Sequence, residues 1–290
     1  MNTARITHER RDGAIFFTLS NGVIAREILC HQTMATLSVI RVAPSGQATE
    51  LVRATSRECV VTLNGQVYSI GGAAGQQDQA FVLDSDLAKL RPLTDDAIFL
   101  GVRTEPYKHP IQSPTAPAKR GISLIGTFEI TRGSAKGIRV LVRHTIFDDL
   151  AVLEKQIEII NPTPSTVRLN HIVFEELSTV EPDSVVDPTT QWERQSITVL
   201  SDFMFHGMTI SSANQIAQWS TDETFTSQVN YELKTPCKLI CSLPNGPDID
   251  LTANETFVSP RAVLVCHAST ERELRGRDIR QTWKGLAQWT

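Results

Sequence analysis

The sequence predicts an all-β protein built as a large antiparallel sandwich. Short runs of β-branched and aromatic residues, each closed by Gly, Asn, Asp or Pro, recur from Ile15 to about Val265, and this pattern is typical of an all-β chain. Asn64-Gly65 lies between two such runs. Because this pair tolerates the two positive φ angles of a type I′ turn, residues 60–70 predict a tight hairpin.

A second pair of long strands is predicted between residues 138 and 160. Polar and apolar side chains alternate over residues 139–144, and Asp148-Asp149 then provides a turn into residues 152–160. Asn161-Pro162 ends the second strand, because proline cannot donate a hydrogen bond to a sheet. Long strands with one polar and one apolar face suit sheets that pack face to face.

Helical periodicity is strong only at the C-terminal end, where an amphipathic helix is predicted to leave the sandwich. Thr270 and Glu273 have the spacing of a capping box. An apolar stripe at roughly helical spacing follows, formed by Leu274, Ile279, Trp283 and Leu286. We therefore divide the chain into a β-sandwich domain over residues 1–268 and a C-terminal helical segment over residues 269–290.

Two shorter features interrupt the strands. Residues 84–90 predict a short helix that Pro92 ends. Residues 108–120 carry three prolines among small residues, which indicates a surface loop.

Charge and hydropathy exclude several classes of protein. The 290 residues hold 28 Lys and Arg against 32 Asp and Glu, a net charge of −4 with the two signs interspersed. A protein that binds nucleic acid instead concentrates basic side chains on one face. No run of 18 apolar residues is present, and residues 1–5 do not begin a signal peptide. We expect neither a nucleic-acid partner nor a membrane partner.

The cysteines indicate a reducing compartment. They are odd in number, scattered, and set mostly inside apolar runs, as buried free thiols are: Cys30, Cys59, Cys237, Cys241 and Cys266. Only Cys237 and Cys241 are close together, and no second Cys or His pair lies near them, which argues against zinc. We therefore expect a cytoplasmic protein that holds no metal and no cofactor.

Several segments resemble the N-terminal domain of bacterial α-galactosidase-like glycoside hydrolases. The matches recur in order along nearly the whole chain, as LSNGVIAR at residues 19–26, GVRTEPY at 101–107, QVNY at 228–231 and GP at 246–247. The resemblance implies a galactose-mutarotase-like supersandwich fold. Residues 283–290 are similar to the junction at which such enzymes continue into a catalytic (β/α) barrel.

The resemblance also implies that the catalytic groups lie in the barrel and not in this domain. In those enzymes the barrel carries the nucleophile and the acid/base carboxylate, and hydrolysis with retention needs both groups, on opposite sides of the glycosidic bond. A barrel would need about 250 further residues. We therefore expect a noncatalytic domain, from a truncated chain or a split enzyme, that supports the barrel and borders a galactoside site. The alternatives are a free-standing aldose 1-epimerase-like or sugar-binding module, and a domain that only forms homo-oligomers.

Three pairs of adjacent acidic residues are candidates for acid/base chemistry: Asp95-Asp96, Asp148-Asp149 and Glu175-Glu176. Neighbours on a strand point to opposite faces, so an adjacent pair cannot converge on one bond. We expect all three pairs to lie at solvated edges and turns.

Residues 167–174 resemble the Asn-His strand of aldose 1-epimerases, in which a histidine protonates the ring oxygen and a distant glutamate removes the anomeric proton. The resemblance makes His171 a candidate catalytic acid. The glutamate that would act as the base could be Glu176, Glu232 or Glu255. The competing interpretation is a structural strand histidine, because fold alone does not define function.

The tryptophans are candidate sugar platforms, since flat aromatic faces commonly grip the apolar side of a sugar ring. We take Trp192, Trp219 and Asp222 as candidate carbohydrate-binding residues, because carboxylates beside these rings can accept hydroxyl protons. Core or interdomain packing is the competing interpretation. Trp283 and Trp289 are expected to face the barrel, and residues 103–107 either do the same or form an ion-paired strand end.

Overall fold

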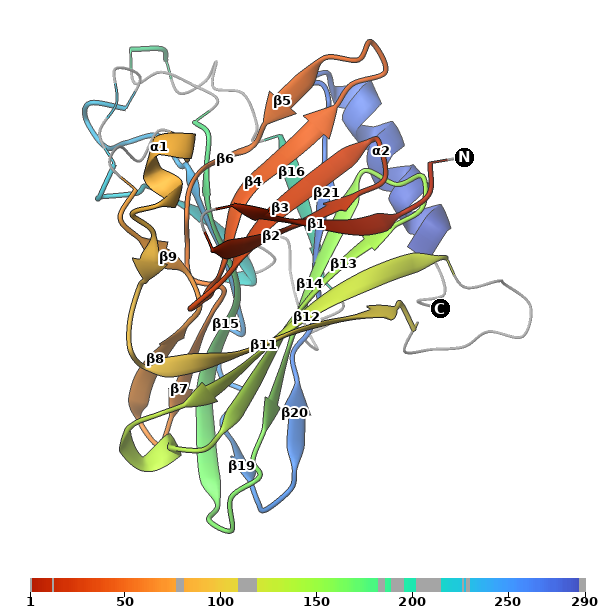
Figure 1. Ribbon diagram of the computed structural model, residues 1–290. Coiled ribbons are helices and arrows are strands. Elements are labelled where there is room, and N and C mark those ends of the chain that lie inside the picture. Colours follow the sequence, from red (N-terminus) through yellow and green to blue (C-terminus); the bar gives the residue numbers. More distant parts are fainter. Residues whose placement is uncertain are drawn as a thin grey trace.

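The computed structural model describes residues 2–11, 13–76, 81–108, 119–181, 186–188, 196–201, 215–225, 227 and 230–286. Three antiparallel sheets make up most of it (Figure 1). Sheet 1 has five strands, β1 (Arg5–Arg11), β2 (Ala14–Ser20), β3 (Ile24–Cys30), β4 (Met34–Val42) and β5 (Ala48–Glu50).

Sheets 2 and 3 have seven strands each. Sheet 2 runs β11 (Ala97–Pro106), β12 (Gly121–Ile130), β13 (Arg139–Phe147), β14 (Val152–Ile160), β21 (Ala262–Cys266) and β16 (Ile197–Ser201), with β20 (Thr256–Val258) beside β14. Sheet 3 runs β17 (Ala217–Ser220), β18 (Lys238–Ser242), β15 (Val167–Thr179), β7 (Cys59–Leu63) and β8 (Gln66–Ile70), with β6 (Val52–Ala54) and β19 (Ile249–Leu251) on β15.

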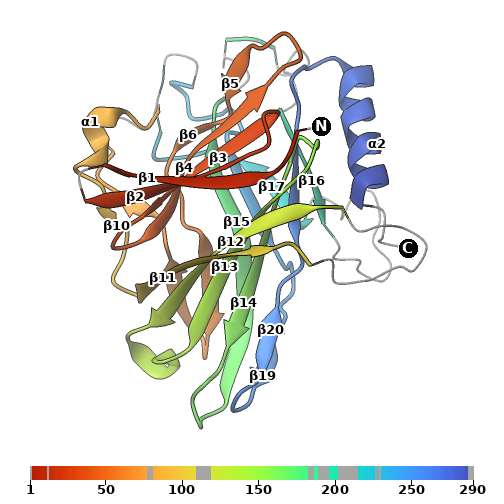
Figure 2. The same cartoon turned by 45° about the vertical axis from the view of Figure 1, so that its right-hand side comes forward.

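The smaller elements are a two-stranded ribbon, a 3₁₀ turn and two helices. They are β9 (Ala73–Ala74), β10 (Arg91–Pro92), η1 (Gly133–Ala135), α1 (Asp84–Leu87) and α2 (Arg272–Leu286). Both views place α1 and α2 on opposite sides of the molecule (Figure 1 and Figure 2). Among the described helices, none combines the length and the hydropathy needed to cross a membrane.

One large apolar core joins the three sheets. Its members include Ile28 of sheet 1, Val142 of sheet 2 and Phe174 of sheet 3. All three side chains are completely buried. The prediction of an antiparallel all-β sandwich with a C-terminal helix is therefore confirmed.

The two predicted hairpins are present. Asn64 and Gly65 have φ angles of 50° and 76°, as a type I′ turn requires, and Leu63 pairs with Gln66. Strands β13 and β14 pair from Arg139 opposite Ile160. These hairpins depend on local rules, which explains why the sequence was sufficient to predict them.

The five cysteines are free and buried, as predicted. Burial raises the pKa of Cys59 and of Cys266 to about 12 in each case. These thiols are therefore not thiolates near neutral pH, and they behave as small apolar core residues.

The C-terminal helix differs from its prediction in two details. Ile279 and Leu286 pack on the sandwich, but Leu274 and Trp283 are 39% and 42% exposed. The corresponding inward positions are taken by Arg275 and Thr282, which are buried. The apolar stripe was therefore correct only in part, because polar side chains with hydrogen-bonding partners fill the rest of the buried face.

The helix cap also differs. Glu271, not Thr270, accepts the hydrogen bonds of the first turn, from the backbone N–H groups of Glu273 at 3.0 Å and of Leu274 at 2.8 Å. These two bonds lower the pKa of Glu271. A carboxylate at this position also interacts favourably with the helix dipole.

Replacing the cap should destabilise α2. We expect Glu271→Ala to lower the midpoint of thermal unfolding by about 2 °C, because two backbone N–H groups lose their acceptor. Thr270→Ala, one residue away, is the matched control and should leave the midpoint unchanged. Calorimetry of both variants checks this, and equal effects would contradict the assignment of the cap to Glu271.

The predicted helix over residues 84–90 is shorter than expected, ending at Leu87. The predicted surface loop over residues 108–120 lies almost wholly outside the described residues.

Candidate functional site

The structure describes two of the three residues that the sequence grouped into a carbohydrate site, Trp219 and Asp222. Trp219 lies on β17 and packs half-buried against the main core. Asp222 is buried beside the Arg53 guanidinium, and its Oδ1 accepts hydrogen bonds from the backbone N–H and the hydroxyl of Thr224 at 3.1 and 2.7 Å. Both oxygens of Asp222 are thus held by protein donors. Trp192 and Trp289 lie outside the described residues.

The pKa of Asp222 reflects this environment. Burial pushes the pKa up, but the two bonds from Thr224 and the positive charge of Arg53 outweigh burial, so the net shift is downward. Arg53 in turn lies 3.8 Å above the ring centroid of Phe225, which adds a cation–π contact. The arrangement ties β6 to the chain that follows β17.

The candidate acid His171 is half-buried on β15, opposite Thr62 of β7. Each glutamate proposed as its partner is engaged elsewhere: Glu176 with Arg57 and Lys238, Glu232 with Lys234, and Glu255 with the backbone N–H of Thr252. Among the described residues, no hydrogen bond or ion pair joins any of the three to His171.

The segment 103–107 forms an ion-paired strand end, one of its two expected interpretations. Arg143 of β13 bonds to Glu105 and, at 2.8 Å, to Glu158 of β14. The Arg143 hydrogen bond lowers the pKa of Glu105. Strands β11, β13 and β14 of sheet 2 are connected in this way, across the intervening strand β12.

The expectation that the acidic pairs are solvated is wrong for Glu175-Glu176 and for Asp96. Glu175 and Glu176 are 0% and 5% exposed. They do point to opposite faces of β15, as expected, with Glu175 facing Lys155 and Glu176 facing Lys238. Their burial follows from the position of β15 in the middle of sheet 3, which the order of residues did not reveal.

The other two acidic pairs divide between surface and interior. Asp148-Asp149 lies at the expected turn, where the two carboxylates accept the backbone N–H groups of Ala4 and Asn2. Asp96 is buried. It accepts a hydrogen bond from the backbone N–H of Ser69 at 2.7 Å and pairs with Arg132, and these contacts compensate its burial.

Glu175 belongs to a charge cluster at the junction of all three sheets, which sequence reasoning missed. Its ionisable members are Arg26 of β3, Glu58 just before β7, His144 of β13, Lys155 of β14 and Glu175 of β15. None of them is more than 1% exposed. The cluster lies too deep to contact a substrate.

Lysine 155 is the centre of the cluster. Its Nζ lies 2.9 Å from Glu58 Oε2 and 2.9 Å from Glu175 Oε1. Arg26 Nη1 lies 3.4 Å from Glu175 Oε2. Two cations thus balance two anions, and a buried charge needs this kind of compensation.

Thr36 connects the two halves of the cluster. Its hydroxyl accepts hydrogen bonds from Arg26 at 3.0 and 2.7 Å and donates to Glu58 Oε1 at 2.9 Å. Its backbone N–H donates to the same oxygen at 2.6 Å. The bonds saturate one oxygen of Glu58, while the other faces Lys155.

The pKa values follow from burial and charge together. Burial raises the pKa of Glu58, but Lys155 and His144 outweigh it, so the net shift is well below the ordinary value. Burial lowers the pKa of Lys155, and the opposing carboxylates Glu175 and Glu58 raise it above the ordinary value. Both groups therefore remain charged in the interior at neutral pH.

His144 behaves differently, because burial and the nearby Arg26 lower its pKa to about 4. Its Nε2 lies 3.0 Å from Glu58 Oε2 but forms no aligned hydrogen bond. The imidazole is therefore neutral at physiological pH. No sequence motif surrounds His144 that could have indicated this role.

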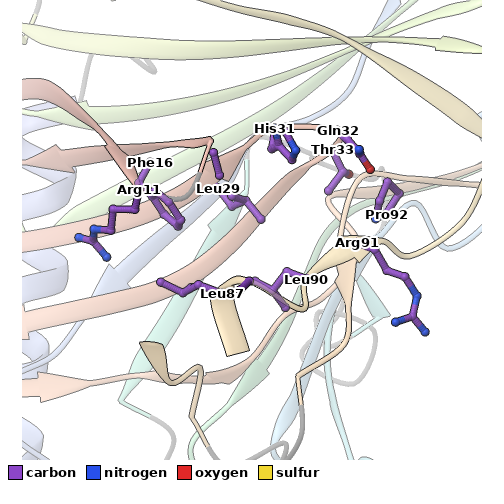
Figure 3. Close-up of a pocket in the computed structure, with 12 residues that line it drawn as sticks. Arg11, Phe16, Leu29, His31, Gln32, Thr33, Leu87, Leu90, Arg91 and Pro92 are labelled. Atoms are coloured by element: carbon purple, nitrogen blue, oxygen red, sulfur yellow. The ribbon is translucent and has the colours of Figure 1, made fainter. Parts of the chain in front are cut away.

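A separate pocket of about 240 Å³ lies on the outer face of sheet 1, between β2, the β3–β4 turn and α1 (Figure 3). None of the predicted site residues lines it. Three segments distant in sequence form it, which explains why no motif indicated it. In the described part of the chain, no group of three His, Cys, Asp or Glu side chains is arranged to hold a metal ion.

Comparison with known proteins gives weak similarity only. No family model matches the sequence, and no curated protein matches it. An α-galactosidase from Lactobacillus brevis has a similar structure, with a TM-score of 0.43 and 12% identity over 97% of this chain and 42% of that one. A GH36 α-galactosidase AgaA variant from Geobacillus stearothermophilus, in complex with 1-deoxygalactonojirimycin, is also similar. Its TM-score is 0.45, with 10% identity over 97% of this chain and 43% of that one.

A TPR-domain containing protein from Parabacteroides distasonis is also similar, with a TM-score of 0.38 and 12% identity over 92% of this chain and 54% of that one. The chain spans less than half the length of the two α-galactosidases it matches. Scores and identities this low do not place the chain in a family.

Removing the central lysine should destabilise the fold strongly. We expect Lys155→Met to lower the free energy of unfolding by about 3–5 kcal/mol, because Glu58 and Glu175 would be left as uncompensated buried charges. Lys238→Met is the matched control at a partly exposed ion pair and should cost less than about 1 kcal/mol. Urea unfolding at pH 7 measures both, and equal losses would contradict a special role for the cluster.

Stability should also depend on pH through His144. The folded-state pKa is about 4 against an ordinary 6.5, so between these values the unfolded chain binds a proton that the folded chain does not. The contribution of neutral His144 to the free energy of unfolding is complete above pH 6.5 and is lost as the pH falls toward 4. The total loss is about 3 kcal/mol.

Urea unfolding between pH 7 and 4 tests this, with His144→Gln expected to flatten the profile. His8→Gln on the exposed strand β1 keeps His144 and should retain the wild-type slope. An unchanged slope in His144→Gln would contradict the assignment.

Proposed function

We propose that the chain is a noncatalytic β-sandwich domain of an α-galactosidase-like glycoside hydrolase, which supports the catalytic barrel and borders its carbohydrate site. The observation that carries the proposal is the outward face of α2. This face combines a rigid attachment to the sandwich with exposed side chains of the kinds that dominate protein interfaces.

Helix α2 is firmly attached to sheet 2. Leu286 and Ile279 pack in a cluster with Phe147 and Val263. A Cβ added at Gly285 would lie 2.8 Å from a methyl group of Leu150, so this part of the helix is in direct contact with the sandwich. The orientation of the outer face is therefore fixed.

A polar chain of contacts reinforces this attachment. His267 Nδ1 lies 3.1 Å from Asp278 Oδ2 of α2, and its Nε2 lies 2.9 Å from the hydroxyl of Thr198 on β16. The histidine side chain is completely buried. It connects the helix to an edge strand of sheet 2.

The outer face of α2 suits a partner surface. Trp283 is 42% exposed, and Arg277, Arg280 and Lys284 are exposed near it. Tryptophan and arginine are the residues most enriched among those that dominate binding energy at interfaces. Basic residues outnumber acidic ones five to two along α2, so the complementary surface would be acidic.

The class of the partner comes from the resemblance of residues 283–290 to the junction with a catalytic barrel. The noncatalytic role rests on the same resemblance, which places both acids that a retaining glycosidase needs in the barrel. The buried free thiols support a cytoplasmic location, where thiols stay reduced.

Trp219, Asp222 and Trp192 remain the residues proposed to border a galactoside. Trp219 is the best placed of the described two, because it lies partly exposed on the edge strand β17. Self-association into a homo-oligomer is part of the proposal and is open to light scattering.

The barrel-docking role predicts a loss of affinity when α2 is altered. We expect Trp283→Ala to weaken binding to the barrel, expressed as a separate chain, by at least about tenfold. Tyr231→Ala is the matched control, because Tyr231 is an exposed aromatic residue outside α2. Calorimetric titration measures both, and equal affinities for wild type and Trp283→Ala would contradict docking through α2.

Activity assays of this chain alone test the noncatalytic role. We expect no hydrolysis of p-nitrophenyl α-galactoside above the buffer rate, and no acceleration of galactose or glucose anomer interconversion in a polarimeter. Hydrolysis would overturn the proposal, and accelerated interconversion that His171→Asn abolishes would establish the epimerase-like alternative.

A further inference from the structure

Strand β11 is a long free edge of sheet 2 (Figure 1). It has ten residues, whereas the end strands β5, β8, β16 and β17 have five or fewer. In the described part of the chain, the backbone of β11 forms hydrogen bonds only with β12. The other side of β11 therefore presents unpaired N–H and C=O groups, to which a further strand can bond.

The first half of this edge is apolar. Residues 97–102 read AIFLGV, and Ile98 and Leu100 are each 50% exposed. The seven-residue end strand β1 instead carries four charged residues, Arg5, Glu9, Arg10 and Arg11. Charged side chains protect a free edge from pairing with another chain. Strand β1 has this protection, and residues 97–102 do not.

The exposed apolar side chains of β11 share one face. Phe99 packs on the main core, and neighbours along a strand point to opposite faces, so Ile98 and Leu100 both point away from the core. A Cβ added at Gly101 would meet no atom within 4 Å. The space beside this part of the strand is therefore open.

A second copy of this chain fits the edge by symmetry. When a strand pairs antiparallel with its own copy, a two-fold axis relates the two, and the same residues serve on both sides. With the axis at Phe99, Ile98 lies opposite Leu100 of the second copy, and Leu100 lies opposite Ile98. Side chains directly opposite each other on one face are in contact, so both apolar side chains become buried.

The charges near the edge agree with the same pairing. Asp95 and Arg103 lie equally far from Phe99 along the chain, on either side of it. Both residues are exposed. The pairing brings Arg103 towards Asp95 of the second copy, once on each side of the axis. Opposite charges that meet in this way favour one register over others.

We propose that β11 pairs antiparallel with β11 of a second copy of this chain, with Phe99 at the two-fold axis, so that two copies of sheet 2 form one continuous sheet. The proposal rests on the self-association included in the proposed function and names its surface. It does not depend on docking of a barrel to α2.

Sedimentation velocity of the full chain over a range of concentrations tests the pairing. We expect a dimer with a dissociation constant at or below about 100 µM, because one strand pair makes a small interface. Leu100→Lys should weaken the dimer at least about tenfold, since a charge on the edge opposes pairing. Val258→Lys is the matched control, because Val258 is equally exposed on β20 of the same sheet, and it should leave the dimer unchanged.

A charge swap tests the register. Arg103→Asp and Asp95→Arg should each weaken the dimer at least about threefold, because like charges then meet across the axis. The double variant Asp95→Arg/Arg103→Asp should restore the dimer. A purely structural role of either residue would not be restored by the swap.

Cross-linking tests the same register directly. Ile98→Cys mixed with Leu100→Cys, with oxidised glutathione as the oxidant, should give the mixed disulfide-linked dimer in preference to either homodimer, because directly opposite residues meet the geometry of a disulfide. Val67→Cys mixed with Leu100→Cys is the control, since Val67 is exposed on β8. The native cysteines are buried and do not compete.

The outcomes separate this proposal from docking through α2. Trp283→Ala should leave the dimer unchanged, and Leu100→Lys should leave the affinity for the barrel unchanged. Circular dichroism and the unfolding midpoint confirm that each variant is folded. The proposal is overturned if the chain is monomeric at every concentration, if Leu100→Lys dimerises like the wild type, or if the Ile98→Cys and Leu100→Cys mixture gives no mixed dimer.

Discussion

The ammonium group of Lys155 lies between two buried carboxylates, at the place where the three sheets meet. Arg26 and Thr36 come from sheet 1, His144 and Lys155 from sheet 2, and Glu175 from sheet 3. Apolar packing alone tolerates small shifts between sheets, because methyl groups are interchangeable neighbours. A buried charge tolerates no such shift, since losing its partner leaves it uncompensated. The cluster therefore favours one mutual arrangement of the sheets.

This arrangement separates the interior from the surfaces available for function. The charged side chains of the buried cluster around Lys155 hold the sheets together in the interior. They take no part in binding. What remains outside is a helix with an exposed tryptophan on one side and a pocket between sheet 1 and the α1 region on the other. A domain of this kind contributes surfaces, and the reaction is left to the barrel that we propose as its partner.

Much of the fold could be predicted from the sequence because it depends on neighbours in the chain. The Asn64-Gly65 turn, the Asp148-Asp149 turn and the C-terminal helix each follow from local backbone preferences. The candidate site could not be predicted in the same way. The environment of Asp222, for example, depends on Arg53, which lies 169 residues away in the chain.

The amino-acid sequence by itself determined the strands, their turns and the burial of the five thiols, since alternation, turn residues and apolar surroundings act over a few residues. Only the tertiary structure decided that Glu175 is buried and that polar Arg275 and Thr282 occupy the inner face of α2. Tertiary contacts also created the pocket, whose walls come from segments on different elements. The reason is physical: the environment of a charge depends on which distant strand lies beside it, and residues adjacent in the sequence do not determine that pairing.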